Sequence, residues 1–388
     1  MSDTPSVIPS PGKTNPTAPT AEAEAKAFVA SQWQLIWWKF RRHKVAMAGG
    51  VVAILMYLIA VFVEFLAPFS AETFWPDYTY APPQTIYYFD VGDNGGLVFR
   101  PFVFGYKVEI EQQALRRVFT IDYEKKIPIG LLVRGEPYKL WGIIPSDIHL
   151  IAPLEKKTPM FLFGSDRLGR DMLSRLIYGT RISLSIGLIG VFMSLILGIV
   201  LGGISGYYGG TVDTIIQRVI EFLRSIPTIP LWMGLAAALP KEWGPLEIYF
   251  GITIILSLIG WTWMARVVRS RFLALRTEDF VIAARLDGSN ELRIILRHMV
   301  PSFLSHIIAS ITLNIPNMIL SETSLSFLGL GLRPPIVSWG VLLQEAQNIR
   351  SVATAPWLLV PGLGVIIVVL AMNFLGDGLR DAADPYGI

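Results

Sequence analysis

Apolar residues gather in six long runs that polar segments separate. The runs cover residues 45–66, 182–204, 215–239, 248–268, 302–320 and 357–375. Each has about the 20 residues that a helix needs to cross the hydrocarbon core of a bilayer. The pattern predicts an all-α polytopic membrane protein with six transmembrane helices and both chain ends on the same side.

The polar segment before the first run divides into two parts. Residues 1–20 are rich in Pro, Ser and Thr without an apolar period, which predicts a disordered tail. Residues 21–44 carry aromatic side chains at helical spacing and end in basic ones. This is typical of an amphipathic helix in the membrane interface. A soluble helix is the less favoured interpretation, because a span follows directly.

The longest polar segment, 67–160, separates the first two runs. Apolar and polar positions alternate at 97–110 and 139–144, and alternation with period two predicts strands. We therefore expect a small β-rich domain there. Since the chain has no cysteine for a disulfide, this domain should lean on the membrane domain or on a partner.

Composition and charge support a membrane assignment and give it an orientation. Of 388 residues, 52% are hydrophobic and 16% are charged, more apolar than an ordinary soluble domain. The net charge of +3 is too small to indicate a nucleic-acid partner. By the positive-inside rule, the basic clusters predict that both termini are cytoplasmic and that 67–160 lies outside. These clusters contain Arg41, Arg42, Lys44, Arg266, Arg269, Arg271, Arg276 and Arg380.

One inner polar segment, 277–301, is predicted to have a defined shape. Thr277 can cap a first helix, and Gly288 occupies the place of a left-handed C-terminal residue. Ser289 can cap a second helix, which Pro301 closes. The pattern favours two short helices joined by a sharp corner. A helical hairpin without a partner is the alternative.

Ala283 and Ala284, followed by Gly288 and then Pro301, resemble the coupling loop of ABC importer permeases. The resemblance implies that a partner ATPase closes over the first helix. Ile282 stands where that family has its leading Glu, so any contact of that carboxylate is absent or replaced here. The residues that the resemblance assigns to ATPase coupling are Ala283, Ala284, Arg285, Asp287, Gly288, Ser289 and Pro301.

Residues 163–183 resemble the segment before the second span in dipeptide, oligopeptide and nickel permeases. Ser165 or Asp166 can cap an amphipathic helix there, and Arg170, Arg175 and Arg181 are expected to stay in water. The resemblance implies a gate at the outer side. A plain surface helix is the alternative. The gate candidates are Asp166, Gly169, Arg170 and Asp171.

The resemblance extends over about 160–388, through an outer loop at 319–347 and a closing span at 361–385. It implies the type I ABC importer permease fold. The insert at 67–160 departs from the compact members and is similar to the longer permeases of the microcin C and peptide branch.

Charged residues in or near the spans are candidates for the translocation pathway, because a charge in a membrane is costly unless it is paired or faces water. They are Glu221, Arg224 and Glu322. Snorkelling of Glu221 and Arg224 to the interface is an equal alternative. Glycines in the second span, among them Gly198, Gly202 and Gly203, permit close helix approach, and Pro227 and Pro230 interrupt the third span.

The motifs of catalysis are missing from the sequence. It contains no phosphate-binding Gly-x-x-x-x-Gly-Lys-Ser/Thr loop, no His-Glu-x-x-His and no Gly-x-Ser-x-Gly. Its four histidines show no metal-ligand spacing. We therefore expect no enzymatic activity, cofactor or metal in this chain, and ATP hydrolysis by a different subunit.

The leading hypothesis is a permease subunit of an ATP-driven importer in the bacterial inner membrane, with peptides as cargo. The resemblance implies a second permease as heterodimer partner, two ABC ATPase subunits and a periplasmic binding protein. Nickel or another small solute remains an alternative cargo. A membrane-anchored receptor is less favoured because six spans exceed what an anchor needs, and a secondary carrier because no internal repeat is evident.

Overall fold

The computed structural model describes residues 32–91, 96–111, 116–240 and 242–383. The predicted tail, 1–20, and part of the predicted interfacial helix lie outside these residues. Helix α2 covers the described part of that interfacial segment. The N-terminal helices are α2 (Gln32–Arg42), α3 (Lys44–Val61) and α4 (Val63–Leu66).

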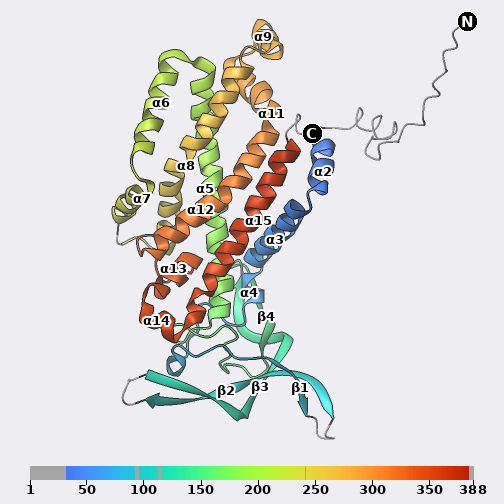
Figure 1. Cartoon of the computed structure of the whole chain (residues 1–388), viewed down its shortest axis with the longest axis vertical. Coiled ribbons are helices and arrows are strands. Elements are labelled where there is room, and N and C mark those ends of the chain that lie inside the picture. The colour runs from blue at the N-terminus through green and yellow to red at the C-terminus, as the bar shows by residue number, and fades with distance from the viewer. Residues whose placement is uncertain (1–31, 92–95, 112–115, 241, 384–388) are drawn as a thin grey trace, which may run out of the picture.

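The membrane domain is a bundle of long helices that lie side by side (Figure 1). Its core is built from Ala, Leu, Ile, Val and Met side chains of α3, α5, α8, α12 and α15. The bundle helices are α5 (Met172–Tyr208), α6 (Gly210–Ser225), α7 (Thr228–Ala237), α8 (Pro245–Leu275), α12 (Leu304–Phe327) and α15 (Val360–Ala383). Short elements connect them: α9 (Asp279–Leu286), α10 (Glu291–Arg293), a π-helical turn Ile294–Met299, α11 (Val300–Ser302), α13 (Trp339–Gln344) and α14 (Ile349–Thr354).

Four helices in the described chain are long and apolar enough to cross a membrane, and up to six spans result if each of two bent pairs is one span. The third predicted span is such a pair, because α6 and α7 meet at 88°. Pro227 lies at this break, as the sequence predicts. The fifth predicted span belongs to the other pair, which is bent by 79°.

Several helices are longer than the apolar runs that predict them. The second span is the outstanding case, since α5 begins at Met172 and includes the segment expected to form a separate amphipathic helix. The fifth continues to Phe327, into the segment assigned to the outer loop. In both cases buried polar side chains continue the helix beyond the apolar run.

A small antiparallel sheet is present between the early helices, as expected. Its strands are β1 (Tyr87–Val91), β2 (Leu97–Glu111), β3 (Arg116–Leu140) and β4 (Ile144–Pro153), in that order. The run at 97–110 is strand β2. The run at 139–144 is a strand only at its two ends, because Lys139 and Leu140 close β3, Ile144 opens β4, and Trp141 and Gly142, with positive φ, form the turn between them.

The sheet rests on the membrane domain, as predicted for a domain without disulfides. β3 and β4 contact α4. His149 bridges two carbonyl oxygens, with Nδ1 2.6 Å from Ala67 O and Nε2 2.8 Å from Glu136 O. In Figure 1 the sheet lies at one end of the bundle, while α2, α9 and the end of α15 lie at the other.

Candidate coupling and translocation sites

The corner expected at Gly288 is present at the end of α9. Gly288 has φ +77°, its N–H donates to Arg285 O at 3.1 Å, and the Ser289 N–H donates to Ala284 O at 3.1 Å. These two bonds are the Schellman arrangement that ends a helix on a left-handed residue. A Cβ at Gly288 would meet no atom within 4 Å, so the positive φ is what requires glycine.

The caps predicted around this corner are wrong. Thr277 Oγ1 donates to Ala274 O, and the N-cap position of α9 belongs to Glu278. The second helix is capped by Asn290, whose Oδ1 accepts from Arg293 N at 2.8 Å, and not by Ser289. Ser289 and Asn290 are both good caps, so their order along the chain did not decide between them.

The sides of α9 and of the following turn that face the bundle are packed against it. Val281, Ile294 and Met299 are buried together with Val268 and Phe272 of α8. Two polar contacts with the C-terminal end of α5 add to this: the Arg285 guanidinium lies 5.6 Å from the ring centre of Tyr207, and Tyr208 donates a hydrogen bond to Glu291. This corner is therefore packed against α5 and α8 together.

The side of this corner that faces away from the bundle is apolar and exposed. Leu286 is 83% exposed, and Phe280, Ile282, Leu292 and Leu296 are exposed with it. Ile282, at the position where the family has Glu, belongs to this surface. Exposed apolar patches of this kind mark contacts with another protein or with the membrane.

At the opposite end of the bundle, Asp166 organises the outer motif. Its Oδ1 accepts from Leu168 N at 2.8 Å and from Arg170 N at 3.0 Å, and its Oδ2 lies 2.7 Å from Arg170 Nε and 3.5 Å from Arg175 Nε. Gly169 has φ +78°, and a Cβ there would overlap Trp75 O. The structure thus brings the four gate candidates together.

Two predictions for this motif are wrong: the helix is not capped by Ser165 or Asp166, and Arg175 is not exposed to water. Asp171 is the N-cap of α5, accepting from Ser174 N at 2.8 Å and from Ser174 Oγ at 2.6 Å. Burial raises the pKa of Asp171 to about 6. Arg175 is 3% exposed, because the chain after α4 covers it and Ala71 O accepts from its Nη1 at 3.1 Å.

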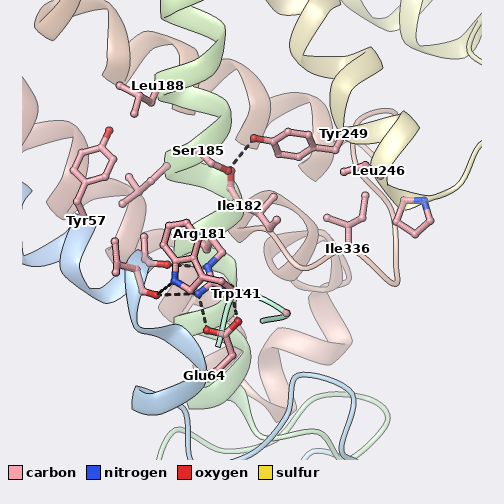
Figure 2. Close-up of a pocket in the computed structure, with 15 residues that line it drawn as sticks. Tyr57, Glu64, Trp141, Arg181, Ile182, Ser185, Leu188, Leu246, Tyr249 and Ile336 are labelled. Carbon is pink, nitrogen blue, oxygen red and sulfur yellow. Dashed lines mark hydrogen bonds and ion pairs between the residues drawn. The ribbon is translucent and has the colours of Figure 1, made fainter. Parts of the chain in front are cut away.

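Arg181 is also partly buried, in a cluster that sequence reasoning missed (Figure 2). Its guanidinium pairs with Glu64 at 2.5 Å and donates to the carbonyl oxygens of Ala60 and Val61, which α3 leaves open where it ends. Trp141 covers the cation, and its Nε1 donates to Val61 O at 2.8 Å. The cluster borders a cavity of about 690 Å³ and joins the sheet to the first span.

The three pathway candidates lie in different surroundings. Glu221 is exposed on α6 and pairs with Arg218 at 2.7 Å. Arg224 lines a second cavity of about 320 Å³. Glu322 is fully buried and accepts hydrogen bonds from Ser183, Ser326 and Ser338, so it holds the outer loop together. A pathway role stays a prediction.

No group of three or more His, Cys, Asp or Glu residues able to hold a metal occurs in the part of the chain that the structure describes.

Two family models match the sequence. Residues 198–386 match the binding-protein-dependent transport system inner membrane component. Residues 31–83 match the N-terminal transmembrane domain of oligopeptide transport permease C. The two matches lie on either side of the sheet and the outer motif.

Characterised relatives agree with these models. The dipeptide transport system permease protein DppC of Alkalihalophilus pseudofirmus is 39% identical over 58% of this chain and 71% of its own length. OppC, the oligopeptide transport system permease protein of Haemophilus influenzae, is 40% identical over 58% of this chain and 70% of that protein. GsiD, the glutathione transport system permease protein of Pectobacterium atrosepticum, is 30% identical over 92% of both chains.

Among solved structures, a chain of the MetNI methionine ABC transporter in an inward-facing conformation is similar over 55% of this chain and 98% of its own, with 18% identity and a TM-score of 0.43. The three relatives are 30 to 40% identical to this chain, and one of them matches it over 92% of both lengths. The chain therefore belongs to the family of inner membrane components of binding-protein-dependent transport systems, in the group related to oligopeptide transport permease C.

Proposed function

We propose that this chain is one of two permease subunits of an ATP-driven importer for peptides, and that the two permeases form the pathway between them. Two ABC ATPase subunits hydrolyse ATP, and a periplasmic binding protein delivers the cargo. The relatives are named as permeases for dipeptides, oligopeptides and glutathione, which favours peptides over nickel as the cargo.

The observation that supports this proposal best is the corner at Gly288, with one face buried against α5 and α8 and the other exposed and apolar. In this proposal an ATPase groove covers the exposed face. Movement of the ATPase then shifts α9, and the buried face transmits the shift to the two helices. Leu286 and Ile282 are the central apolar contacts.

The test is Gly288→Val, assayed in cells by uptake of a labelled peptide pool and by co-purification of the ATPase. A β-branched residue at a positive φ costs on the order of 1 to 3 kcal/mol of local strain. We expect the protein to insert at normal levels while both uptake and ATPase co-purification fall.

Two further variants isolate the cause. Gly288→Asn should retain more function than Gly288→Val, because Asn tolerates the left-handed region. Gly96→Val is the control, since Gly96 has open space around it and lies far from the corner. Normal uptake and normal ATPase co-purification in Gly288→Val would refute the coupling role.

The orientation that we propose places both termini and α9 in the cytoplasm and the sheet in the periplasm. Single cysteines are clean probes because the chain has none. A membrane-impermeant thiol reagent should label Asp90→Cys and Lys125→Cys in intact spheroplasts and leave Asp287→Cys and Asp384→Cys unlabelled. The reverse pattern would overturn the orientation.

In this orientation the insert at 67–160 receives the binding protein or shields the entrance.

A further inference from the structure

A cavity with several polar side chains in a mainly apolar lining lies among α5, α6, α7, α8 and α12, and it is partly open to the surface. Its volume is about 320 Å³. Ser194 lines it from α5, a helix of 37 residues or about 55 Å, at a point well away from either end. The hydroxyl and amide side chains that line it are Ser194, Thr228, Thr262, Asn314, Asn317 and Ser321. Polar side chains of this number, away from the ends of a long apolar helix, are costly against lipid and favour a face turned to water or to cargo.

One side of α12 supplies the amides. Asn314, Asn317 and Ser321 follow one another at spacings of three and four residues, which places them on one face of the helix. Ile315 and Ile319, between them in sequence, are buried in the bundle core. The two amide nitrogens donate to carbonyl oxygens one turn earlier, at 2.9 and 3.3 Å. Their amide oxygens have no partner in the described part of the chain.

The cavity also has donors for an anion. Arg224, in the last turn of α6, is exposed, and no described residue pairs with it. Glu221, one turn earlier, is occupied by Arg218. The indole Nε1 of Trp232 is buried at the cavity and has no hydrogen-bond partner among the described residues. No Asp or Glu is among the described residues that line this cavity.

We propose that this cavity is a station on the translocation pathway that binds the C-terminal carboxylate of the passing peptide. Arg224 and Trp232 donate to the carboxylate, and Asn314 and Asn317 pair with peptide backbone amides. A carboxylate and backbone amides occur in every free peptide, so the station accepts peptides of differing sequence. This inference rests on the proposed function and adds to it the group of the cargo that the permease recognises.

The test compares peptide pools in cells that express the complete transporter. One pool contains random tetrapeptides of Gly, Ala, Ser and Leu as free acids, and the second contains the same sequences as C-terminal amides. A third carries an internal Glu and a C-terminal amide, to distinguish a terminal from a side-chain carboxylate. We expect Arg224→Gln to lower free-acid uptake about tenfold, the factor of one lost charge-assisted bond. Uptake of the amide pool should stay within about twofold of the unsubstituted protein.

Matched variants separate this role from a structural one. Arg271→Gln makes the same change at an exposed arginine of α8 that does not line the cavity, and it should leave uptake of all three pools unaffected. Trp232→Phe retains the ring but removes the donor, so it should also lower free-acid uptake selectively. Arg224→Lys should retain part of the preference for the free acid. If Arg224→Gln also lowers uptake of the third pool, the cavity binds any carboxylate of the peptide. That result would refute the proposal that it recognises the C-terminal carboxylate.

Two results would overturn the proposal. Equal losses on the acid and amide pools in Arg224→Gln would make Arg224 a gating or structural residue, and unchanged uptake of the acid pool would remove it from the pathway. In either case the permease function would remain. Failure of the unsubstituted chain to support uptake of any pool, compared with cells that lack it, would instead refute peptide import itself.

Discussion

Replacement of Glu322 by Ala is expected to destabilise the outer side of the bundle by on the order of 3 to 5 kcal/mol. The carboxylate lies 3.3 Å from Ser183 Oγ, 2.8 Å from Ser326 Oγ and 2.7 Å from Ser338 Oγ. All three hydroxyls would lose their buried acceptor, at about 1 kcal/mol each, and a cavity would be added.

The loss would extend beyond these serines, because each hydroxyl also accepts from a backbone N–H. Ser183 Oγ accepts from Trp339 N, Ser326 Oγ from Leu332 N and Ser338 Oγ from Val341 N, at 3.0 to 3.2 Å. Glu322 thereby fixes the segment that follows α12, including the start of α13. Without it, these hydroxyls would no longer be oriented toward one acceptor.

Thermal unfolding of the purified protein, followed by tryptophan fluorescence, measures this effect. Trp339 is fully buried beside the network, so it is one of the eleven tryptophans whose emission should change when this region unfolds. Glu322→Gln should lower the melting temperature less than Glu322→Ala does, because the amide retains one acceptor oxygen. Glu247→Ala, at an exposed glutamate in the first turn of α8, is the control. Equal melting temperatures for Glu322→Ala and this control would contradict the assignment.

Glu322 also shows what the sequence could not predict. Its role in the pathway stays a prediction, but the sequence does not show that its partners include Ser183, 139 positions away. The prediction that Arg175 stays in water was wrong for a similar reason, because the residues that cover Arg175 lie far from it in sequence, just after α4. An amphipathic pattern reports which face of a helix is apolar, and it does not report which distant segment returns to cover a charge.

Features set by local chemistry were predicted well. The corner at Gly288 depends on one residue with positive φ at a helix end, and the break between α6 and α7 depends on Pro227. Both causes lie within a few residues of their effects. The turn at Trp141 was missed because an aromatic residue with positive φ has no sequence signature and is fixed by its bond to Val61 O.

The glycines of the second span allow α5 and α8 to meet closely, as the sequence predicts. Gly198, Gly202 and Gly206 recur every four residues on the side of α5 that faces α8. A Cβ on Gly198 would lie 2.6 Å from Met264 Cβ, and one on Gly206 would lie 2.6 Å from Phe272 Cβ. At Gly202 the added atom would overlap Ala265 O and lie 2.8 Å from Ala265 Cα.

Gly202→Val is therefore expected to separate α5 from α8 and to prevent stable folding, with a loss above about 4 kcal/mol. The obstacle is backbone, which cannot move aside as a flexible side chain would. Gly234→Val is the control, because Gly234 lies within α7 with no atom within 4 Å of the added Cβ. The amount of monodisperse protein recovered in mild detergent measures the difference. Because α9 packs against α5 and α8, Gly202→Val should also abolish ATPase co-purification. Normal protein recovery and normal co-purification would show that the two helices can move apart without loss of folding.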